Sequence, residues 1–265
     1  MKRSVLFSLT GALVLGAAML LLAPNGAGAF FSLPGLLVVF GGTLAATLLS
    51  RPLSEVRKLR HTLPQLFRPE ASEVERDIAQ LLSFAQKHRF ASPRAAEQLL
   101  GGISSPFVAA GLRQVVEGCN AEDLARSLQW RIAGVRSQEN SQTQILYTMA
   151  AFAPAFGMLG TLFGLVHMLS GIGDAGLDQI GGSMAFAMVT TVYGIIASNL
   201  VFKPLAIKME RRTTQRLMQM SSLMEGILQV HQKRHPMLIS ESLEACFAHC
   251  QTTATVQPPL TLVKA

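Results

Sequence analysis

The sequence predicts an all-α, polytopic membrane protein with four transmembrane helices and a helical cytoplasmic domain. Only 15% of the 265 residues are charged while 49% are hydrophobic, whereas ordinary soluble domains carry about 25% charged residues. Four uncharged stretches each reach the roughly 20 residues that a helix needs to cross a bilayer core. One Trp and two Tyr argue against a barrel with aromatic girdles.

The predicted spans are residues 4–23, 30–50, 147–169 and 181–202, none of which contains Asp, Glu, Lys or Arg. A helix satisfies its own backbone in lipid, so each stretch is a plausible span. The first stretch also resembles a secretory signal, because Lys2 and Arg3 precede it and a small-residue run follows at 27–29. It is longer than the usual apolar region of 7–15 residues, and a second span follows at once, which favours a retained helix.

Basic residues flank the spans on one side only. They precede the first span (Lys2, Arg3) and follow the second (Arg51, Arg57, Lys58, Arg60) and the fourth (Lys203, Lys208, Arg211, Arg212, Arg216). The loop between the third and fourth spans carries Asp174 and Asp178 and no base. The positive-inside rule therefore predicts cytoplasmic N- and C-termini in an inner membrane. The basic residues 208–216 are expected to face membrane lipids, not nucleic acid.

This topology divides the chain into four parts. Residues 1–50 hold the first two spans, 51–146 a cytoplasmic helical domain, 147–204 the last two spans, and 205–265 a helical tail with a loose C-terminus. An apolar stripe over 78–85 predicts one cytoplasmic helix. Pro93 and Pro106 suit the first turns of two more. Asn120 opens a helix that can run unbroken into the third span.

Small and polar residues mark one face of each of the last two spans. In the third span, glycines recur at i, i+3 and i+7: Gly157, Gly160 and Gly164. In the fourth, one face carries Thr191, Gly194 and Ser198. Pro154 frees a backbone carbonyl near the cytoplasmic end of the third span. Two interpretations stay open: ordinary packing with hydroxyls bonded to backbone carbonyls, or a polar groove that faces a partner helix.

The spans lack the ionisable group that an ion carrier normally keeps in the membrane. A carboxylate would therefore have to come from a partner. His167 is expected to be a neutral histidine bonded to a neighbouring helix. Cys246, His249 and Cys250 lack a matching second ligand pair, even with His231 and His235 upstream, so no metal site is predicted. Motifs for enzyme chemistry, such as a phosphate loop or nucleophile elbow, do not occur in the sequence.

Four sequence runs carry a resemblance to a known family. They are APAFGMLGT at 153–161, TTVYG at 190–194, NLVFKP at 199–204 and LVVFGGT at 37–43. Together with the order of spans, domain and tail, they resemble the MotA/PomA family, the A-subunits of flagellar stators. The likeness covers nearly the whole chain.

The resemblance implies a homopentameric ring around a dimer of a MotB/PomB-type B-subunit, whose single span carries the ion-binding Asp. Ion flow turns the ring, and its cytoplasmic domains push the rotor protein FliG. By resemblance, the last two spans line the partner, with residues for partner-helix packing and coupling at Pro154, Gly157, Gly160, Gly164, Tyr193, Gly194 and Pro204. No cofactor is implied beyond the transported cation.

The predicted ion pathway holds Thr161, Thr191 and Thr190. Thr161 and Thr191 match positions where sodium-type stators keep a hydroxyl. Sodium needs several oxygen ligands and a proton needs none, so the match favours Na⁺. H⁺ stays open, because the related proton-driven TolQ/ExbB proteins resemble this pattern with Thr as well. A TolQ/ExbB-like energiser of outer-membrane processes and a structural scaffold without ion flow are the alternative functions.

The predicted rotor-facing stretch departs from the family pattern. Lys87 and Arg89 keep its basic part, but Arg94 falls near the position of the usual acidic residue, and the nearest acid is Glu97. The stretch is either a solvated helix face of mixed charge or an altered electrostatic match to its own rotor.

Overall fold

The computed structural model describes residues 31–66, 71–88, 98–171, 176–243 and 245–246, and over these residues every regular element is helical. Three helices are long and apolar enough to cross a membrane, at Leu33–Ser50, Ala121–Ser170 and Gln179–His231. They contain the third and fourth predicted spans and all but the first three residues of the second. The first predicted span, 4–23, lies outside the described residues, so the count of four stays a prediction.

The chain divides into two compact units, each made of two segments. The first unit is Met1–Lys58 with Thr143–Ala206, and the second is Leu59–Gln142 with Ile207–Ala265. The predicted continuation of the helix after Asn120 into the third span is observed, since α8 runs from Ala121 to Ser170 without a break. Its first part therefore belongs to the second unit and its last part to the first.

In the first unit, three consecutive helical segments form the second span: α2 (Leu33–Leu36), the π-helical η2 (Leu37–Gly41) and α3 (Gly42–Ser50). Ser32 caps the start, because its hydroxyl accepts from the amide of Gly35. Thr43 and Thr47 are buried and donate to carbonyls one turn back, at 2.6 and 2.7 Å. These hydroxyls are thus satisfied within their own helix.

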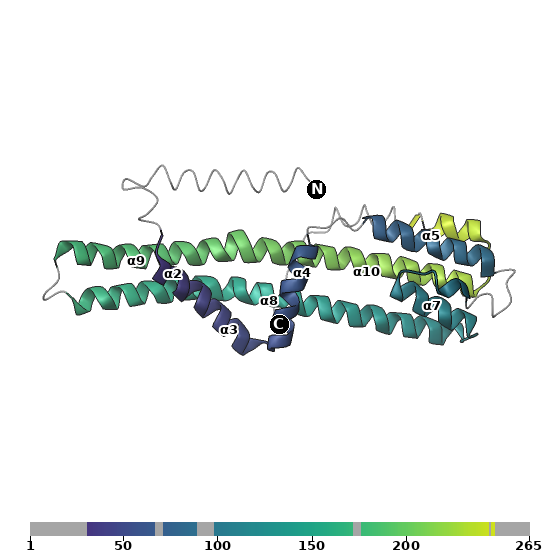
Figure 1. Cartoon of the computed structure of the whole chain (residues 1–265), viewed down its shortest axis with the longest axis horizontal. Coiled ribbons are helices and arrows are strands. Elements are labelled where there is room, and N and C mark those ends of the chain that lie inside the picture. The colour runs from purple at the N-terminus through teal and green to yellow at the C-terminus, as the bar shows by residue number, and fades with distance from the viewer. Residues whose placement is uncertain (1–30, 67–70, 89–97, 172–175, 244, 247–265) are drawn as a thin grey trace, which may run out of the picture. The chain divides into compact units, whose positions relative to one another are not determined.

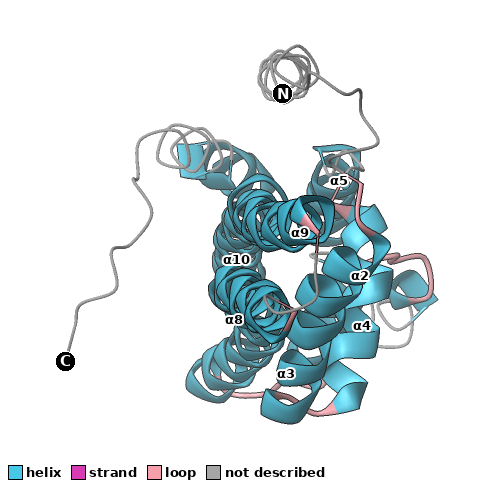
Figure 2. Cartoon of the chain, turned by 90° about the vertical axis from the view of Figure 1, so that its left-hand side faces the viewer, coloured by secondary structure: helices cyan, strands magenta, loops and turns pink. Residues whose placement is uncertain are grey.

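The last part of α8 forms an antiparallel pair with α9 (Leu177–Ile196), which continues through the π-helical η3 (Ala197–Phe202) (Figure 1). The segments α2 and α3 run along one side of this pair (Figure 2). Phe40 meets Phe202 edge-on with ring centroids 6.5 Å apart. The ring of Phe156 occupies the space beside Gly42, where a Cβ would clash with it.

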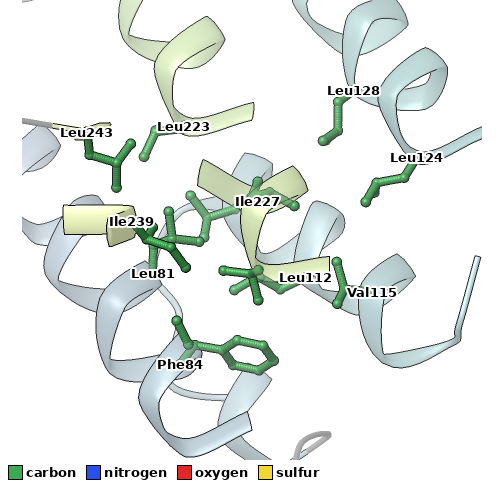
Figure 3. Packing of buried hydrophobic residues seen from close by; sticks show 13 residues of the cluster. Leu81, Phe84, Leu112, Val115, Leu124, Leu128, Leu223, Ile227, Ile239 and Leu243 are labelled. Atoms are coloured by element: carbon green, nitrogen blue, oxygen red, sulfur yellow. The ribbon is translucent and has the colours of Figure 1, made fainter. Parts of the chain in front are cut away.

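The second unit has its own apolar core, built by α5 (Ala71–His88), α7 (Pro106–Val116), the first part of α8, α10 (Lys203–His231) and the helical residues 236–243. Pro106 begins α7 after Ser105, as predicted. Gly118 ends this helix with φ +76°, a conformation that favours glycine. The fully buried core side chains meet between these helices (Figure 3): Leu81, Leu112, Leu124, Leu128, Ile227, Ile239 and Leu243.

Polar contacts join α10 to other elements of this unit. Ser242 donates its hydroxyl to the side-chain oxygen of Gln229 at 2.9 Å. Arg216 donates to the carboxylate of Glu139 on α8 at 2.6 Å. The Nε2 of His231 donates to the carbonyl of Cys119 at 2.8 Å. α10 is therefore hydrogen-bonded to α8 near its middle and to the Cys119 carbonyl at its end. The helix α4 (Leu53–Gln65) begins in the first unit and ends in the second.

Candidate functional site

The glycine face of α8 packs directly against α9 of the same chain. A Cβ built on Gly157 would lie 3.1 Å from the carbonyl of Thr190, and one on Gly194 only 2.7 Å from the carbonyl of Ala153. A Cβ on Gly160 would lie 2.6 Å from the Thr190 side chain. Backbone meets backbone here, so larger residues would push the helices apart. Packing of these glycines against a separate partner helix stays a prediction.

Toward the other end of the pair, Gly164 contacts α9 at Ala187, where a Cβ would lie 2.8 Å from the Ala187 Cβ. His167 Nδ1 lies 3.1 Å from the hydroxyl of Ser183, which itself donates to the Gln179 carbonyl at 3.0 Å. The hydroxyl has one proton and gives it to Gln179, so the ring nitrogen is the donor. The predicted bond of His167 to a neighbouring helix is confirmed.

The three predicted ion-pathway threonines occupy different environments. Thr190 is fully buried and donates to the Ala187 carbonyl at 2.8 Å. A Cβ built on Gly35 of α2 would lie 3.0 Å from the Thr190 methyl group. Because Gly160 of α8 also faces this side chain, Thr190 lies at the junction of α2, α8 and α9. Thr191 is half-buried beside Gly157.

Thr161 lies next to the glycine face and is half-buried. Its hydroxyl proton goes to the carbonyl of Met158 at 2.6 Å. The oxygen keeps two lone pairs for another donor or a cation. Of these threonines, Thr161 thus offers a more accessible oxygen than the fully buried Thr190.

Near Pro154, at the end of the helix pair opposite to Gly164, the predicted coupling residues surround a hydrogen bond between the two helices. Pro154 lies inside α8 and has no amide to offer the carbonyl of Ala150, four residues earlier. Ser198 of η3 donates to that carbonyl at 2.6 Å. Sequence reasoning placed Ser198 on this face but missed its partner. The available signal was the four-residue spacing from Ala150 to Pro154, because it identifies Ala150 as the residue whose carbonyl lacks a helical amide donor.

Tyr193 and Pro204 lie on either side of Ser198 in the sequence. The Tyr193 hydroxyl accepts from the Ser32 amide at 3.0 Å and so ties α9 to the start of the second span. Pro204 follows η3 inside the helical stretch Gln179–His231, so its position has no amide to donate to the preceding turn. The structure thus gathers Pro154, Gly194 and Ser198 in one place.

The predicted rotor-facing residues are mostly outside the described part of the chain. Lys87 is exposed near the end of α5, whereas Arg89, Arg94 and Glu97 fall in residues 89–97. Among the residues that the structure covers, no group of three or more His, Cys, Asp or Glu is arranged to hold a metal ion. His249 and Cys250 lie outside that part.

The site therefore supplies hydroxyl and carbonyl oxygens but no ionisable acid from the described spans. Apolar side chains on the outer faces of α8 and α9 are exposed in the single chain: Met158, Leu162, Phe163, Val166, Leu169, Met188 and Ile195. Such faces suit lipid or another apolar helix. An ion carrier that relays its cation on an acidic group would therefore need that carboxylate from another protein.

Comparison with known proteins places the chain among ion-channel proteins. Residues 101–222 match the model of the MotA/TolQ/ExbB proton channel family. The chain is 30% identical over 220 residues to Motility protein A of Borreliella burgdorferi, covering 83% of this chain and 84% of that protein. It is 31% identical over 217 residues to Chemotaxis protein PomA of Vibrio alginolyticus, with 82% and 84% covered.

Solved structures share the fold. The C. jejuni MotAB structure contains a chain that matches with a TM-score of 0.82 at 18% identity, over 99% of this chain and 100% of that one. The flagellar MotAB stator complex from Bacillus subtilis matches with a TM-score of 0.76 at 22% identity, over 95% and 98%. The fold of this chain is therefore one already seen in MotAB structures.

Proposed function

Because the chain belongs to the MotA/TolQ/ExbB family, we propose that it is the A-subunit of an ion-driven flagellar stator. It is a channel-family membrane protein and not an enzyme, as the lack of catalytic motifs predicts. The observation that carries the proposal is the close α8–α9 pair, in which Gly157 and Gly194 bring two backbones together beside the threonine hydroxyls.

The proposed partner is a MotB/PomB-type B-subunit. The spans of this chain contain no Asp or Glu, so ion transfer needs a carboxylate from another protein. The two matching structures are of MotAB from C. jejuni and of the MotAB stator complex from Bacillus subtilis, which supports such a partner. In the proposed assembly, five copies of this chain surround a dimer of the B-subunit and push FliG with their cytoplasmic parts.

Sodium is the proposed coupling ion, with the proton as the alternative. Thr161 keeps both lone pairs of its hydroxyl oxygen available beside the glycine face. A sodium ion shared with a partner carboxylate would use such an oxygen as a ligand. Thr190 is fully buried, so its part in the pathway would be to shape the helix pair.

The proposed location is the inner membrane, with both termini in the cytoplasm. The charge pattern supports this orientation, because the basic residues after residues 50 and 202 would then lie inside. The same orientation puts the second unit, with Lys87 on α5, on the rotor side.

The test is genetic complementation in a host without its own stators. The chain is expressed with the B-subunit gene from the same source, and swimming and co-purification of the two proteins are measured. Swimming that requires both genes supports the proposal. Co-purification without swimming, together with rescue of an outer-membrane integrity defect, would favour the TolQ/ExbB-like energiser. A complex that supports neither process would favour the scaffold.

A further inference from the structure

The hydrogen-bond ladder of α8 is interrupted at Pro154. In an α-helix each carbonyl accepts from the amide four residues later, so the Ala150 carbonyl would need an amide at position 154. Proline has none. Ala150 is 8% exposed, and in a membrane interior no bulk water replaces the missing donor. The carbonyl therefore needs a donor from another side chain.

Ser198 provides that donor from the facing helix. Its hydroxyl donates to the Ala150 carbonyl at 2.6 Å, and its side chain is buried. The contact depends on Gly194, one turn earlier on the same face, because a Cβ there would lie 2.7 Å from the Ala153 carbonyl. Close backbone approach at Gly194 thus brings the short serine side chain within reach of α8.

Ser198 also takes part in a second irregular turn. It lies in η3, where the amide of Lys203 donates to the Ser198 carbonyl five residues back, which is the π-helical pattern. Pro204 follows directly, so the next position again has no amide. Ser198 therefore bonds, through its hydroxyl, the carbonyl that Pro154 leaves without an amide and, through its carbonyl, the last amide before Pro204.

We propose that Ser198 is a positioning residue that holds these two proline-interrupted turns in register. Its hydroxyl is bonded to the α8 backbone at the Ala150 carbonyl, and its carbonyl accepts from the Lys203 amide in the π-helical turn from which α10 begins. A shift of α8 at Pro154 is thereby passed to the start of α10. This use of the bond in torque generation rests on the proposed stator function, whereas the bond's role in positioning η3 does not.

The test is a double-variant cycle in the full chain, purified as a complex with its B-subunit. Ser198→Ala removes the side-chain donor, and Pro154→Ala restores a backbone amide to the Ala150 carbonyl. Amide hydrogen exchange at Lys203 reports on η3. Because hydrogen bonds between membrane helices have modest strength, Ser198→Ala should speed this exchange about 3- to 20-fold. In the Pro154→Ala background, Ser198→Ala should speed exchange at Lys203 by about twofold or less, because the Ala150 carbonyl then has a backbone donor.

Thr47→Val is the matched control. Thr47 is fully buried in the same unit, but its hydroxyl bonds a carbonyl of its own helix at 2.7 Å. Its replacement should leave exchange at Lys203 unchanged in both backgrounds. An equal effect of Ser198→Ala in both backgrounds, or no effect in either, would overturn the proposal.

Swimming separates this inference from the proposed function. At equal membrane levels, cells with Ser198→Ala should swim more slowly than cells with Thr47→Val, and full speed would overturn the coupling role. If the unmodified chain and its B-subunit drive no swimming at all, the stator function fails. The exchange cycle still decides, in that case, whether Ser198 positions η3.

Discussion

Gly157 and Gly194 bring the backbones of α8 and α9 into contact: a Cβ on Gly194 would lie 3.1 Å from the Cα of Gly157. The third and fourth spans therefore touch through main-chain atoms, with Gly160 and Gly164 extending the contact along α8. This contact fixes where the threonine hydroxyls and the proline-interrupted turns lie.

Gly160→Leu should abolish rotation while the protein still inserts in the membrane. A Cβ at this position already lies 2.6 Å from the Thr190 side chain, so a leucine must separate the helices. Swimming and the membrane level of the protein are measured together. The matched control is Gly41→Leu, since nothing lies within 4 Å of a Cβ at Gly41. Normal swimming with Gly160→Leu would refute the close helix contact.

Even one methyl group should distinguish these two glycines. Gly160→Ala forces overpacking and should lower the free energy of unfolding of the complex by about 1–3 kcal/mol. Gly41→Ala should raise it by up to about 1 kcal/mol, because alanine favours helix. Denaturant titration of the purified complex measures both. A similar response of the two variants would contradict the difference in packing.

Thr161→Ala should change the sodium dependence of swimming, whereas Thr190→Ala should lower the stability of the protein. Thr161 is accessible and bonds only within its own helix, so its replacement should keep the protein stable and raise the sodium concentration needed for half-maximal speed. Thr190 is fully buried between three helices, and its loss leaves a small cavity that should cost about 1 kcal/mol of stability. The measurements are swimming against sodium and thermal stability. A destabilised Thr161→Ala protein would contradict the assignment.

Tyr193→Phe should loosen the start of the second span. The Tyr193 hydroxyl accepts from the Ser32 amide at 3.0 Å, and a hydrogen bond of this kind contributes about 0.5–1.5 kcal/mol. Amide exchange at Ser32 should therefore become faster, while the contact at Gly157 stays protected. Unchanged exchange at Ser32 would show that the hydroxyl does not hold this segment.

Glu139→Gln should have a small, salt-dependent effect. The carboxylate bonds Arg216 at 2.6 Å; the glutamate side chain is 16% exposed, but the arginine side chain is 52% exposed, so water and salt reach the pair. Pairs of this kind contribute up to about 1 kcal/mol, and salt screens them further. Stability measured in low and high salt should differ more in the unmodified chain than in the variant. A salt-independent loss of several kcal/mol would instead indicate a buried charge contact.

The all-helical class, the apolar stripes and one helix start could be predicted from the sequence, because they depend on local spacing. Leu81 and Ala85 are buried as their periodicity predicts, and Pro106 begins α7. The helix that begins after Asn120 and runs unbroken into the third span also followed from local signals. The second unit's core, by contrast, combines helices from three separate stretches of the chain, and periodicity does not say which faces meet.

The site was harder to predict, since its contacts are tertiary. Spacing identified the glycine face but not whether α9 of the same chain or another protein covers it. Thr190 and Thr191 are adjacent in sequence, yet only the packing of Gly35 and Gly160 shows that Thr190 is fully buried. The π-helical segments at 37–41 and 197–202 have no periodic signature, and the Ser198–Ala150 bond joins residues 48 positions apart.

The most direct test of the stator assignment is swimming speed against external sodium at fixed pH and ionic strength. The strain should carry only this chain and the B-subunit gene from the same source as its stator. The account predicts that speed rises and saturates with sodium and vanishes when potassium replaces it. Speed indifferent to sodium would contradict sodium coupling and indicate protons. No swimming, with both proteins present in the membrane, would contradict the stator function itself.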